Sequence, residues 1–213
     1  MSANRERLPL PAPESMTEAQ RAAAERLRAG PRKAVKGPFI PLLRSPELLN
    51  RLEKVGEYLR FESALPRRLS EFATLLVARA WSQQFEWVMH APLALDAGTS
   101  RETIDALREG CRPPSMSAAE AKVHDFVCEL LNTRGVAQAT YESVVAELGE
   151  QGVIDLVGIV GYFTSISMIL NVARTPPEPN DDVELLPARV ACGRSAACGR
   201  RGSRVVRHRQ SEL

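Results

Sequence analysis

Hydrophobic residues recur every three or four positions along most of the chain, which is the period of a helix with one buried face. A clear example starts at Ser45, Pro46 and Glu47, which supply an N-cap, a proline at the first helical position and an early acid. Apolar side chains then follow at helical spacing: Leu48, Leu49, Leu52, Val55 and Leu59. No alternating run bounded by turns predicts a strand. We therefore expect an all-α protein.

Start and stop signals divide the rest of the chain into further helices. Two capping boxes, Thr17 with Gln20 and Ser117 with Glu120, each predict a helix start. Ser82 is the expected N-cap of the helix that carries Phe85, Glu86, Trp87 and His90. The predicted helices cover residues 17–29, 67–81, 83–97, 100–109, 117–133, 137–148 and 153–172.

The last of these helices contains the longest apolar stretch, which approaches membrane-spanning length. It is interrupted by Asp155, by Gly158 and Gly161, and by several hydroxyl and amide side chains. We therefore expect a buried core or oligomer helix rather than a membrane span. Residues 1–13 are polar and proline-rich and lack the apolar segment of a secretory signal, so the cytoplasm is the expected location.

Composition suggests one helical domain with two extensions. The chain has 213 residues, of which 44% are hydrophobic and 25% charged, as in soluble globular proteins. We expect an extended N-terminal arm (1–16), a helical domain (17–180) and an arginine-rich, disordered tail (181–213). Seven arginines and one glutamate follow Ala188, so a net charge of +2 leaves the body mildly acidic. This balance predicts no nucleic-acid partner.

Candidate chemistry gathers around Glu86 and His90, which are four residues apart and thus share one helix face. Phe85 and Trp87 place aromatic rings beside them. Glu71 stands inside an otherwise apolar helical run, where burial is expected to raise its pKa. At the start of a helix, the dipole favours negative charge on Glu86. Such a trio suits proton transfer, although buried ionisable groups also occur in purely structural networks.

The cysteines predict neither a metal site nor a thiol pair. Cys111, Cys128, Cys192 and Cys198 show no C-x-x-C spacing and no zinc-binding pattern with histidine. We expect free thiols and no bound metal.

Several short motifs together resemble the carboxymuconolactone decarboxylase family, which belongs to the alkylhydroperoxidase-like fold group. The resemblance runs over about residues 5 to 180 and excludes the arginine-rich tail. It rests on the order and spacing of Gly37-Pro38-Phe39, Leu65-Pro66-Arg67-Arg68-Leu69-Ser70-Glu71, Gln84-Phe85-Glu86-Trp87-Val88-Met89-His90-Ala91-Pro92 and Ala97-Gly98-Thr99-Ser100, with Tyr141, Leu156-Val157-Gly158, Tyr162 and Leu170-Asn171-Val172 further on. It implies an alkylhydroperoxidase-like helical bundle that assembles as a homotrimer or larger homo-oligomer.

The resemblance also implies a site. In the peroxidase branch a Glu precedes C-x-x-C-x-x-x-H, and these positions correspond to Glu71, Gln83, Glu86 and His90. Both thiols are therefore absent, which opposes peroxide reduction of the alkylhydroperoxidase or peroxiredoxin type.

The decarboxylase branch also lacks the thiol pair and uses no metal or organic cofactor. By this resemblance we expect a lyase that acts on a small carboxylated lactone or related acid, as in aromatic compound degradation. His90 and Glu86 would transfer and orient the proton, and Glu71 would support them. The expected substrate-binding residues are Phe39, Arg79, Gln83, Phe85 and Trp87, with Arg79 as the cation for an anionic substrate. A non-catalytic oligomer that binds a small molecule is the remaining alternative.

Overall fold

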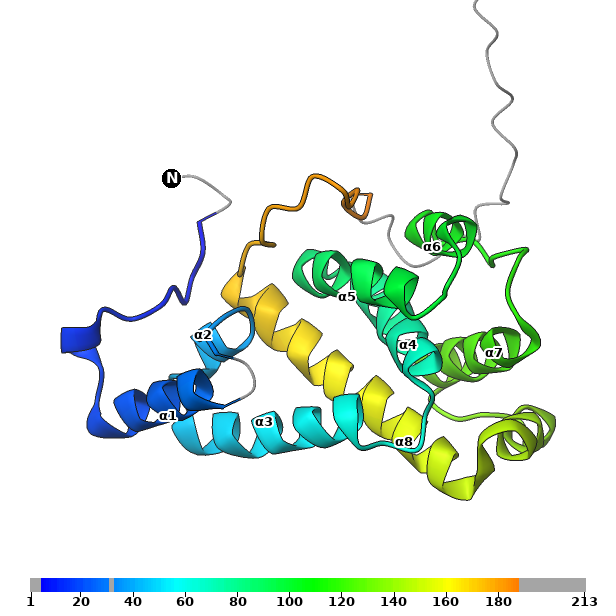
Figure 1. Cartoon of the computed structure of the whole chain (residues 1–213), viewed down its shortest axis with the longest axis horizontal. Helices are drawn as coiled ribbons and strands as arrows, with labels where there is room; N and C mark the ends of the chain where they lie inside the picture. The colour runs from blue at the N-terminus through cyan, green and yellow to red at the C-terminus, as the bar shows by residue number, and fades with distance from the viewer. Residues whose placement is uncertain (1–4, 31–32, 188–213) are drawn as a thin grey trace, which may run out of the picture.

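The helices of the protein surround one long apolar helix, α8. A computed structural model describes residues 5–30 and 33–187, and within them all regular structure is helical (Figure 1). The expectation of an all-α fold is confirmed. The elements are η1 (Pro13–Ser15), α1 (Glu18–Ala29), α2 (Phe39–Leu42), α3 (Pro46–Phe61), α4 (Arg67–Ala80), α5 (Gln84–Asp96), α6 (Arg101–Arg108), α7 (Ala118–Thr133) and α8 (Gln138–Ala173).

Helix α8 runs between two groups of helices, with α1 to α3 on one side and α4 to α7 on the other (Figure 1). Helix α4 packs against α5, α7 and α8, and every residue from Leu69 to Ala78 is buried. A helix covered on several sides has no need for a polar face, which explains the almost wholly apolar run in the sequence. Glu71 is the acid enclosed within it.

Helix α8 joins the two helices expected at the end of the body. Gly149 interrupts it with φ 71° and ψ 172°, a non-helical conformation that glycine adopts without the steric penalty of a side chain. By length and composition α8 could cross a membrane, since an 18-residue window of it is strongly apolar. However, 56% of that window is buried inside the protein, as in the core helix of a helical domain.

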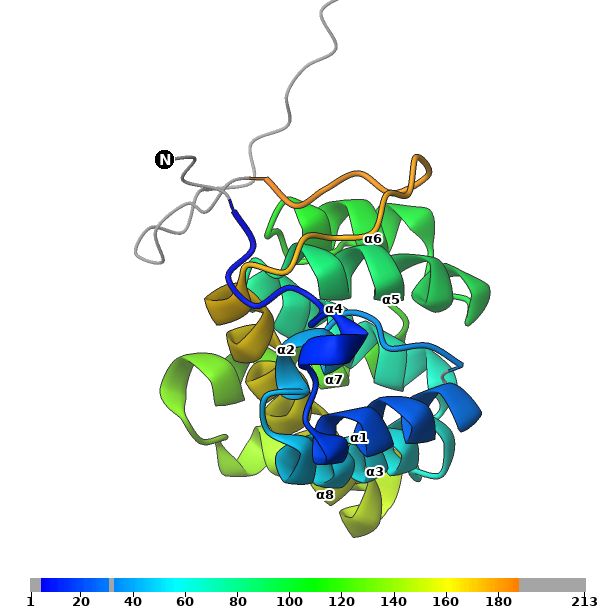
Figure 2. The same ribbon diagram turned by 90° about the vertical axis from the view of Figure 1, so that its left-hand side faces the viewer.

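Both chain extensions lie against the helical body (Figure 2). At the N-terminal side, the backbone N–H of Arg7 donates to the carbonyl of Ala173 at 2.7 Å. At the C-terminal side, the indole Nε1–H of Trp87 donates to the carbonyl of Glu184 at 3.0 Å, and Gln84 exchanges two hydrogen bonds with the backbone of Leu186. We call residues 175–187 the C-terminal strap. It includes the first seven residues of the predicted tail, and 188–213 lie outside the described residues.

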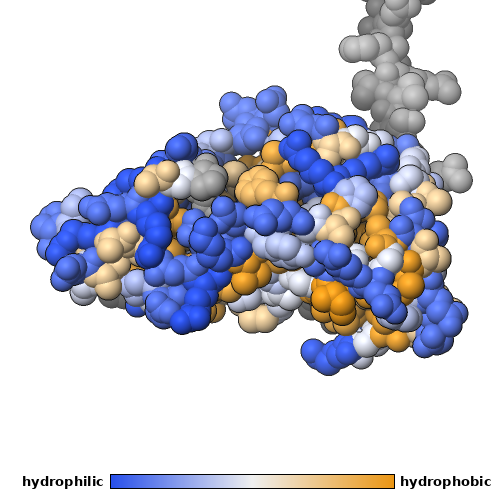
Figure 3. Space-filling model, turned by 60° about the horizontal axis from the view of Figure 1, so that its bottom comes forward, coloured by the Kyte–Doolittle hydropathy of each residue, from blue (hydrophilic) through white to orange (hydrophobic). Residues whose placement is uncertain are grey.

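One face of the protein carries open apolar surface. Figure 3 shows hydrophobic areas in the middle and on the right of this face, among hydrophilic surroundings. On α8, the exposed large hydrophobic side chains are Ile154, Val157, Met168 and Val172. Their spacing places them along one side of that helix, opposite the buried residues Leu156, Ile159, Phe163 and Leu170.

Candidate functional site

The three candidate catalytic residues meet between α4 and α5. His90 Nδ1 lies 2.6 Å from Glu71 Oε2, and His90 Nε2 lies 3.4 Å from Glu86 Oε2. The three residues are only 4% to 6% exposed. The imidazole also packs edge-on against Phe163 of α8, with ring centroids 5.0 Å apart. The helices thus hold the ring between two carboxylates.

The turn before α5 fixes the position of Glu86. Gln83, and not Ser82 as expected, is the N-cap, and its Oε1 accepts hydrogen bonds from the backbone N–H groups of Phe85 (2.6 Å) and Glu86 (3.4 Å). Ser82 instead adopts a left-handed conformation with φ 48° in the turn. Gln83 also donates to Asn171 of α8 at 3.1 Å. Gln83 therefore positions the carboxylate-bearing turn rather than facing the cavity.

The electrostatics of the trio favour a protonated imidazole. Burial lowers the pKa of His90, but hydrogen bonds to Glu71 and Glu86 and their negative charges outweigh it and raise the pKa to about 9. Burial raises the pKa of Glu71, but the hydrogen bond to His90 and the positive charges of His90, Arg60 and Arg67 together outweigh burial. The net effect is a pKa below the ordinary value. The expectation of a raised pKa for Glu71 was therefore wrong, because its apolar sequence neighbours do not reveal the imidazole 19 residues away.

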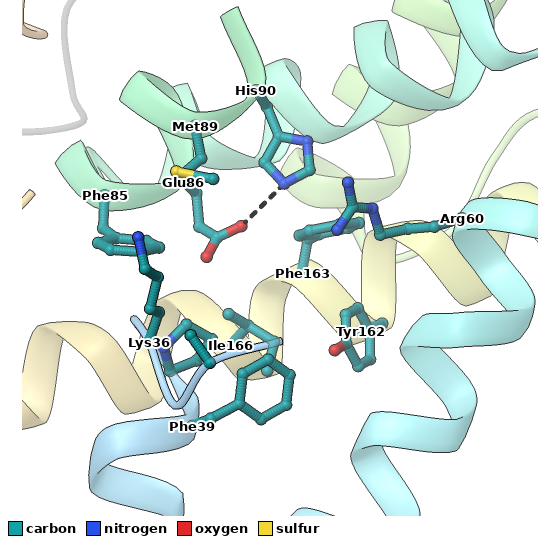
Figure 4. A pocket seen from close by; sticks show the side chains of 12 residues that line it. Lys36, Phe39, Arg60, Phe85, Glu86, Met89, His90, Tyr162, Phe163 and Ile166 are labelled. Carbon is teal, nitrogen blue, oxygen red and sulfur yellow. Dashed lines mark ion pairs between the residues drawn. The ribbon is translucent and has the colours of Figure 1, made fainter. Parts of the chain in front are cut away.

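A cavity of about 190 Å³ opens beside the trio (Figure 4). Glu86 and His90 both line it, whereas Glu71 lies behind the imidazole and is not part of the lining. The other walls are mainly apolar and come from the loop before α2 and from α2, α5 and α8: Phe39, Phe85, Met89, Tyr162, Phe163 and Ile166. The site can therefore enclose a small, partly apolar molecule with the imidazole at its edge.

Gly37 allows the loop before α2 to approach α5. Its φ is 52°, and a Cβ atom there would lie 2.3 Å from Cζ of Phe85. Only a residue without a side chain fits both the conformation and the space. The Gly37-Pro38-Phe39 motif thus builds one wall of the cavity.

Two cations line the cavity, and Arg79 is not one of them. They are Lys36, directly before Gly37, and Arg60 in the last turn of α3 (Figure 4). The guanidinium of Arg79 lies against Gly110, where an added Cβ would be 2.7 Å from Nη2. Trp87 is also absent from the lining, because its indole is buried and bonded to the C-terminal strap. Arg60 belongs to α3, whereas the trio lies on α4 and α5, so the spacing of residues within one helix could not identify it as a cavity residue.

Two other buried acids have structural partners. Glu120 is fully buried and accepts two hydrogen bonds from Arg68, at 3.0 and 2.8 Å, and one from Thr99. Asp155 accepts hydrogen bonds from Tyr58 and from the backbone of Ala64, which fixes the loop between α3 and α4. These contacts account for both acids without a ligand.

In the described part of the chain, the potential metal ligands form no cluster and the cysteines lie apart from the cavity. Residues 5–30 and 33–187 contain no group of three or more His, Cys, Asp or Glu side chains arranged to hold a metal ion. Cys128 is a free thiol, and neither Cys111 nor Cys128 lines the cavity. Cys192 and Cys198 lie outside the described residues.

Comparison with solved structures shows the same fold in bacterial proteins of low sequence identity. A structure from Ralstonia eutropha JMP134, described as an alkylhydroperoxidase AhpD core and an uncharacterized peroxidase-related protein, matches with a TM-score of 0.66 and 15% identity, over 83% of this chain and 93% of that one. An uncharacterized peroxidase-related protein from Silicibacter sp. TM1040 gives 0.66 and 16%, over 84% and 95%. A protein of unknown function from Agrobacterium tumefaciens, described as a putative antioxidant defence protein AhpD, gives 0.59 and 16%, over 68% and 100%.

The sequence comparisons match part of the chain to a family. No curated protein matches the chain. Residues 46–126, which run from the start of α3 into α7, match the model of the carboxymuconolactone decarboxylase family. This segment contains Glu71, Glu86 and His90. This match covers less than half of the chain, so residues 46–126 resemble the carboxymuconolactone decarboxylase family, and the solved structures show that the chain shares their helical fold.

Proposed function

We propose that the protein is a cofactor-independent lyase that removes carbon dioxide from a small carboxylated lactone or a related acid. The observation that carries this proposal is the buried His90, held between two carboxylates at the edge of a small cavity. With a pKa raised to about 9, its imidazole is protonated near neutral pH and can act as a general acid.

The chemistry needs a proton donor and little else. When the bond between the ring carbon and the leaving carboxylate breaks, its electron pair moves through the conjugated carbon–carbon double bond onto the lactone carbonyl oxygen. A proton from His90 then goes to carbon, and the neutral imidazole regains a proton from water. Glu71 stabilises the imidazolium, and Glu86 orients it from the other side. The apolar walls keep water from the anionic intermediate.

Thiol-dependent peroxide reduction is the weaker proposal. The structural relatives are described as peroxidase-related, but their identity to this chain is only 15% to 16%. The two positions that correspond to cysteines in the peroxidase branch are Gln83 and Glu86, and neither side chain can form a disulfide. A thiol-blocking reagent should therefore leave the activity unchanged.

The direct test is to add γ-carboxymuconolactone to the purified protein and to follow carbon dioxide release and ultraviolet absorbance. His90→Ala and Glu86→Gln should each reduce turnover by at least about 100-fold, as expected for loss of a general acid or its orienting partner. Absence of turnover in a folded wild-type protein would reject this substrate. Unchanged turnover in His90→Ala would reject the assigned chemistry. If Glu86→Gln alters ligand affinity in a protein without turnover, a binding function replaces the lyase.

We also propose that the chain works in the cytoplasm as a homotrimer or larger homo-oligomer. The exposed apolar side of α8, with Ile154, Val157, Met168 and Val172, supports self-association because such surface is rarely left open to water. Light scattering coupled to size exclusion would measure the mass. Substitution of Ile154 and Val157 by lysine should shift it toward that of a single chain of 23.4 kDa.

A further inference from the structure

Arg60 supplies a guanidinium to the wall of the cavity. It belongs to the last turn of α3, and its guanidinium reaches toward His90 and Phe163 (Figure 4). Among residues 5–30 and 33–187, its buried Nε has no hydrogen-bond partner and its guanidinium forms no ion pair. A buried N–H group without a partner is unfavourable, and in a native protein such a group calls for an explanation.

The other two cations that could be considered are placed differently. Lys36 is paired with Glu178 of the C-terminal strap at 3.3 Å, and its side chain is 61% exposed, so it lies at the rim. Arg79 also has a buried Nε without a partner, but it packs near Gly110 and does not line the cavity. Of these three cations, Arg60 is therefore the one that lines the cavity beside His90 without an ion pair among the described residues.

A carboxylate is the ligand that fits this arrangement. A guanidinium presents its donors in a planar fork that matches two carboxylate oxygens. The adjacent rings of Phe163 and Tyr162, which meet edge-to-face at 5.1 Å, can contact the apolar part of a small ligand. Glu86 on the opposite wall repels an anion, so a carboxylate is favoured at the Arg60 end of the cavity.

We propose that Arg60 binds a substrate carboxylate that is retained in the product, which makes it the residue that selects small organic anions. This inference rests on the proposed lyase function, because only a decarboxylation distinguishes a retained carboxylate from a leaving one. A cation paired with the leaving carboxylate would stabilise the substrate more than the transition state, because that group loses its charge as the bond breaks. A cation on the retained carboxylate holds the molecule with its reacting carbon toward His90. Because this carboxylate keeps its charge throughout, the cation stabilises the substrate and the transition state equally.

Binding of 2-furylacetate and of its uncharged amide to the full chain, measured by calorimetry, tests the anion site without any need for turnover. The carboxylate should bind at least about tenfold more tightly than the amide, as expected for charge-assisted hydrogen bonds. Arg60→Met should remove this preference and leave amide binding unchanged, whereas Arg60→Lys should retain part of it. Arg51→Met is the matched control, since Arg51 lies on the same helix with a side chain that is 75% exposed.

Equal affinity of wild type and Arg60→Met for the carboxylate would overturn the proposal, and so would failure of the wild type to bind it. A changed oligomeric mass of Arg60→Met with unchanged carboxylate affinity would show that Arg60 pairs with a second copy instead. Turnover of γ-carboxymuconolactone, measured in parallel, separates the two proposals. If the carboxylate preference depends on Arg60 but no turnover occurs, the anion site stands without the lyase. If turnover occurs and Arg60→Met leaves KM unchanged, the lyase stands without the anion site.

Discussion

Replacing Glu71 by glutamine removes the closer of the two charges that keep His90 protonated. The interval from the ordinary pKa of 6.5 to about 9 corresponds to roughly 3 kcal/mol in favour of the imidazolium. The shorter contact, at 2.6 Å against 3.4 Å, belongs to Glu71. With that charge gone and burial unchanged, the pKa of His90 should fall by roughly two pH units. The ring would then be mainly neutral above pH 7.

The same change alters how stability depends on pH. Because the pKa of His90 is raised in the folded state, its contribution is complete below pH 6.5 and is lost as the pH rises through about 9. The free energy of unfolding of the wild type should therefore fall by roughly 3 kcal/mol across this window from His90 alone. In Glu71→Gln most of that decline should be absent.

Nitrogen-detected titration of the imidazole signals measures the pKa directly. The chain has three histidines, so the His90 signal can be identified by its loss in His90→Gln. Glu47→Gln is a suitable control, because the side chain of Glu47 is 73% exposed and pairs with Arg51 on the surface. The reasoning is refuted if His90 still titrates near pH 9 in Glu71→Gln, or if the control lowers its pKa equally.

Two further substitutions test the supports of the site. Gly37→Ala should lower the free energy of unfolding by about 2 kcal/mol or more, because the added Cβ combines a positive φ with a clash against Phe85. The cavity wall at Phe85 should open as a result. Gly135→Ala, where nothing lies within 4 Å of the added Cβ, should have little effect in the same denaturant titration. Glu120→Gln should cost roughly 1.5 to 3 kcal/mol, because it weakens the charge-assisted hydrogen bonds between Arg68 and the buried Glu120. A denaturation midpoint equal to that of the wild type would contradict this contribution.

Local signals in the sequence were sufficient where neighbouring residues determine the structure. The capping boxes at Thr17 and Ser117 form as predicted, and both helices start at the next residue. The i,i+4 spacing likewise brings Glu86 and His90 onto one face of α5. These features depend on contacts within one turn of helix, so the order of residues specifies them.

Features that depend on packing between helices could not be predicted from the sequence, because the residues involved lie far apart along the chain. Arg79 and Arg60 are both arginines in the last turn of a helix, and only the crossing of α3 and α8 brings Arg60 to the cavity. The pKa of Glu71 likewise follows from an imidazole on another helix. The preference of serine for N-cap positions predicted that α5 begins directly after Ser82. In the structure Ser82 belongs to the turn between α4 and α5, and Gln83 is the N-cap.

The chain has two tryptophans, and their hydrogen bonds make them optical reporters of different parts of the molecule. The indole of Trp81 donates to Thr164 of α8 at 3.2 Å, whereas that of Trp87 donates to the backbone of the C-terminal strap. Release of the strap would expose the Trp87 indole to water and shift its emission to longer wavelength, while Trp81 would respond only when α8 separates from α4. Single-tryptophan proteins made with Trp81→Phe or Trp87→Phe would thus distinguish detachment of the strap from unfolding of the core by fluorescence alone.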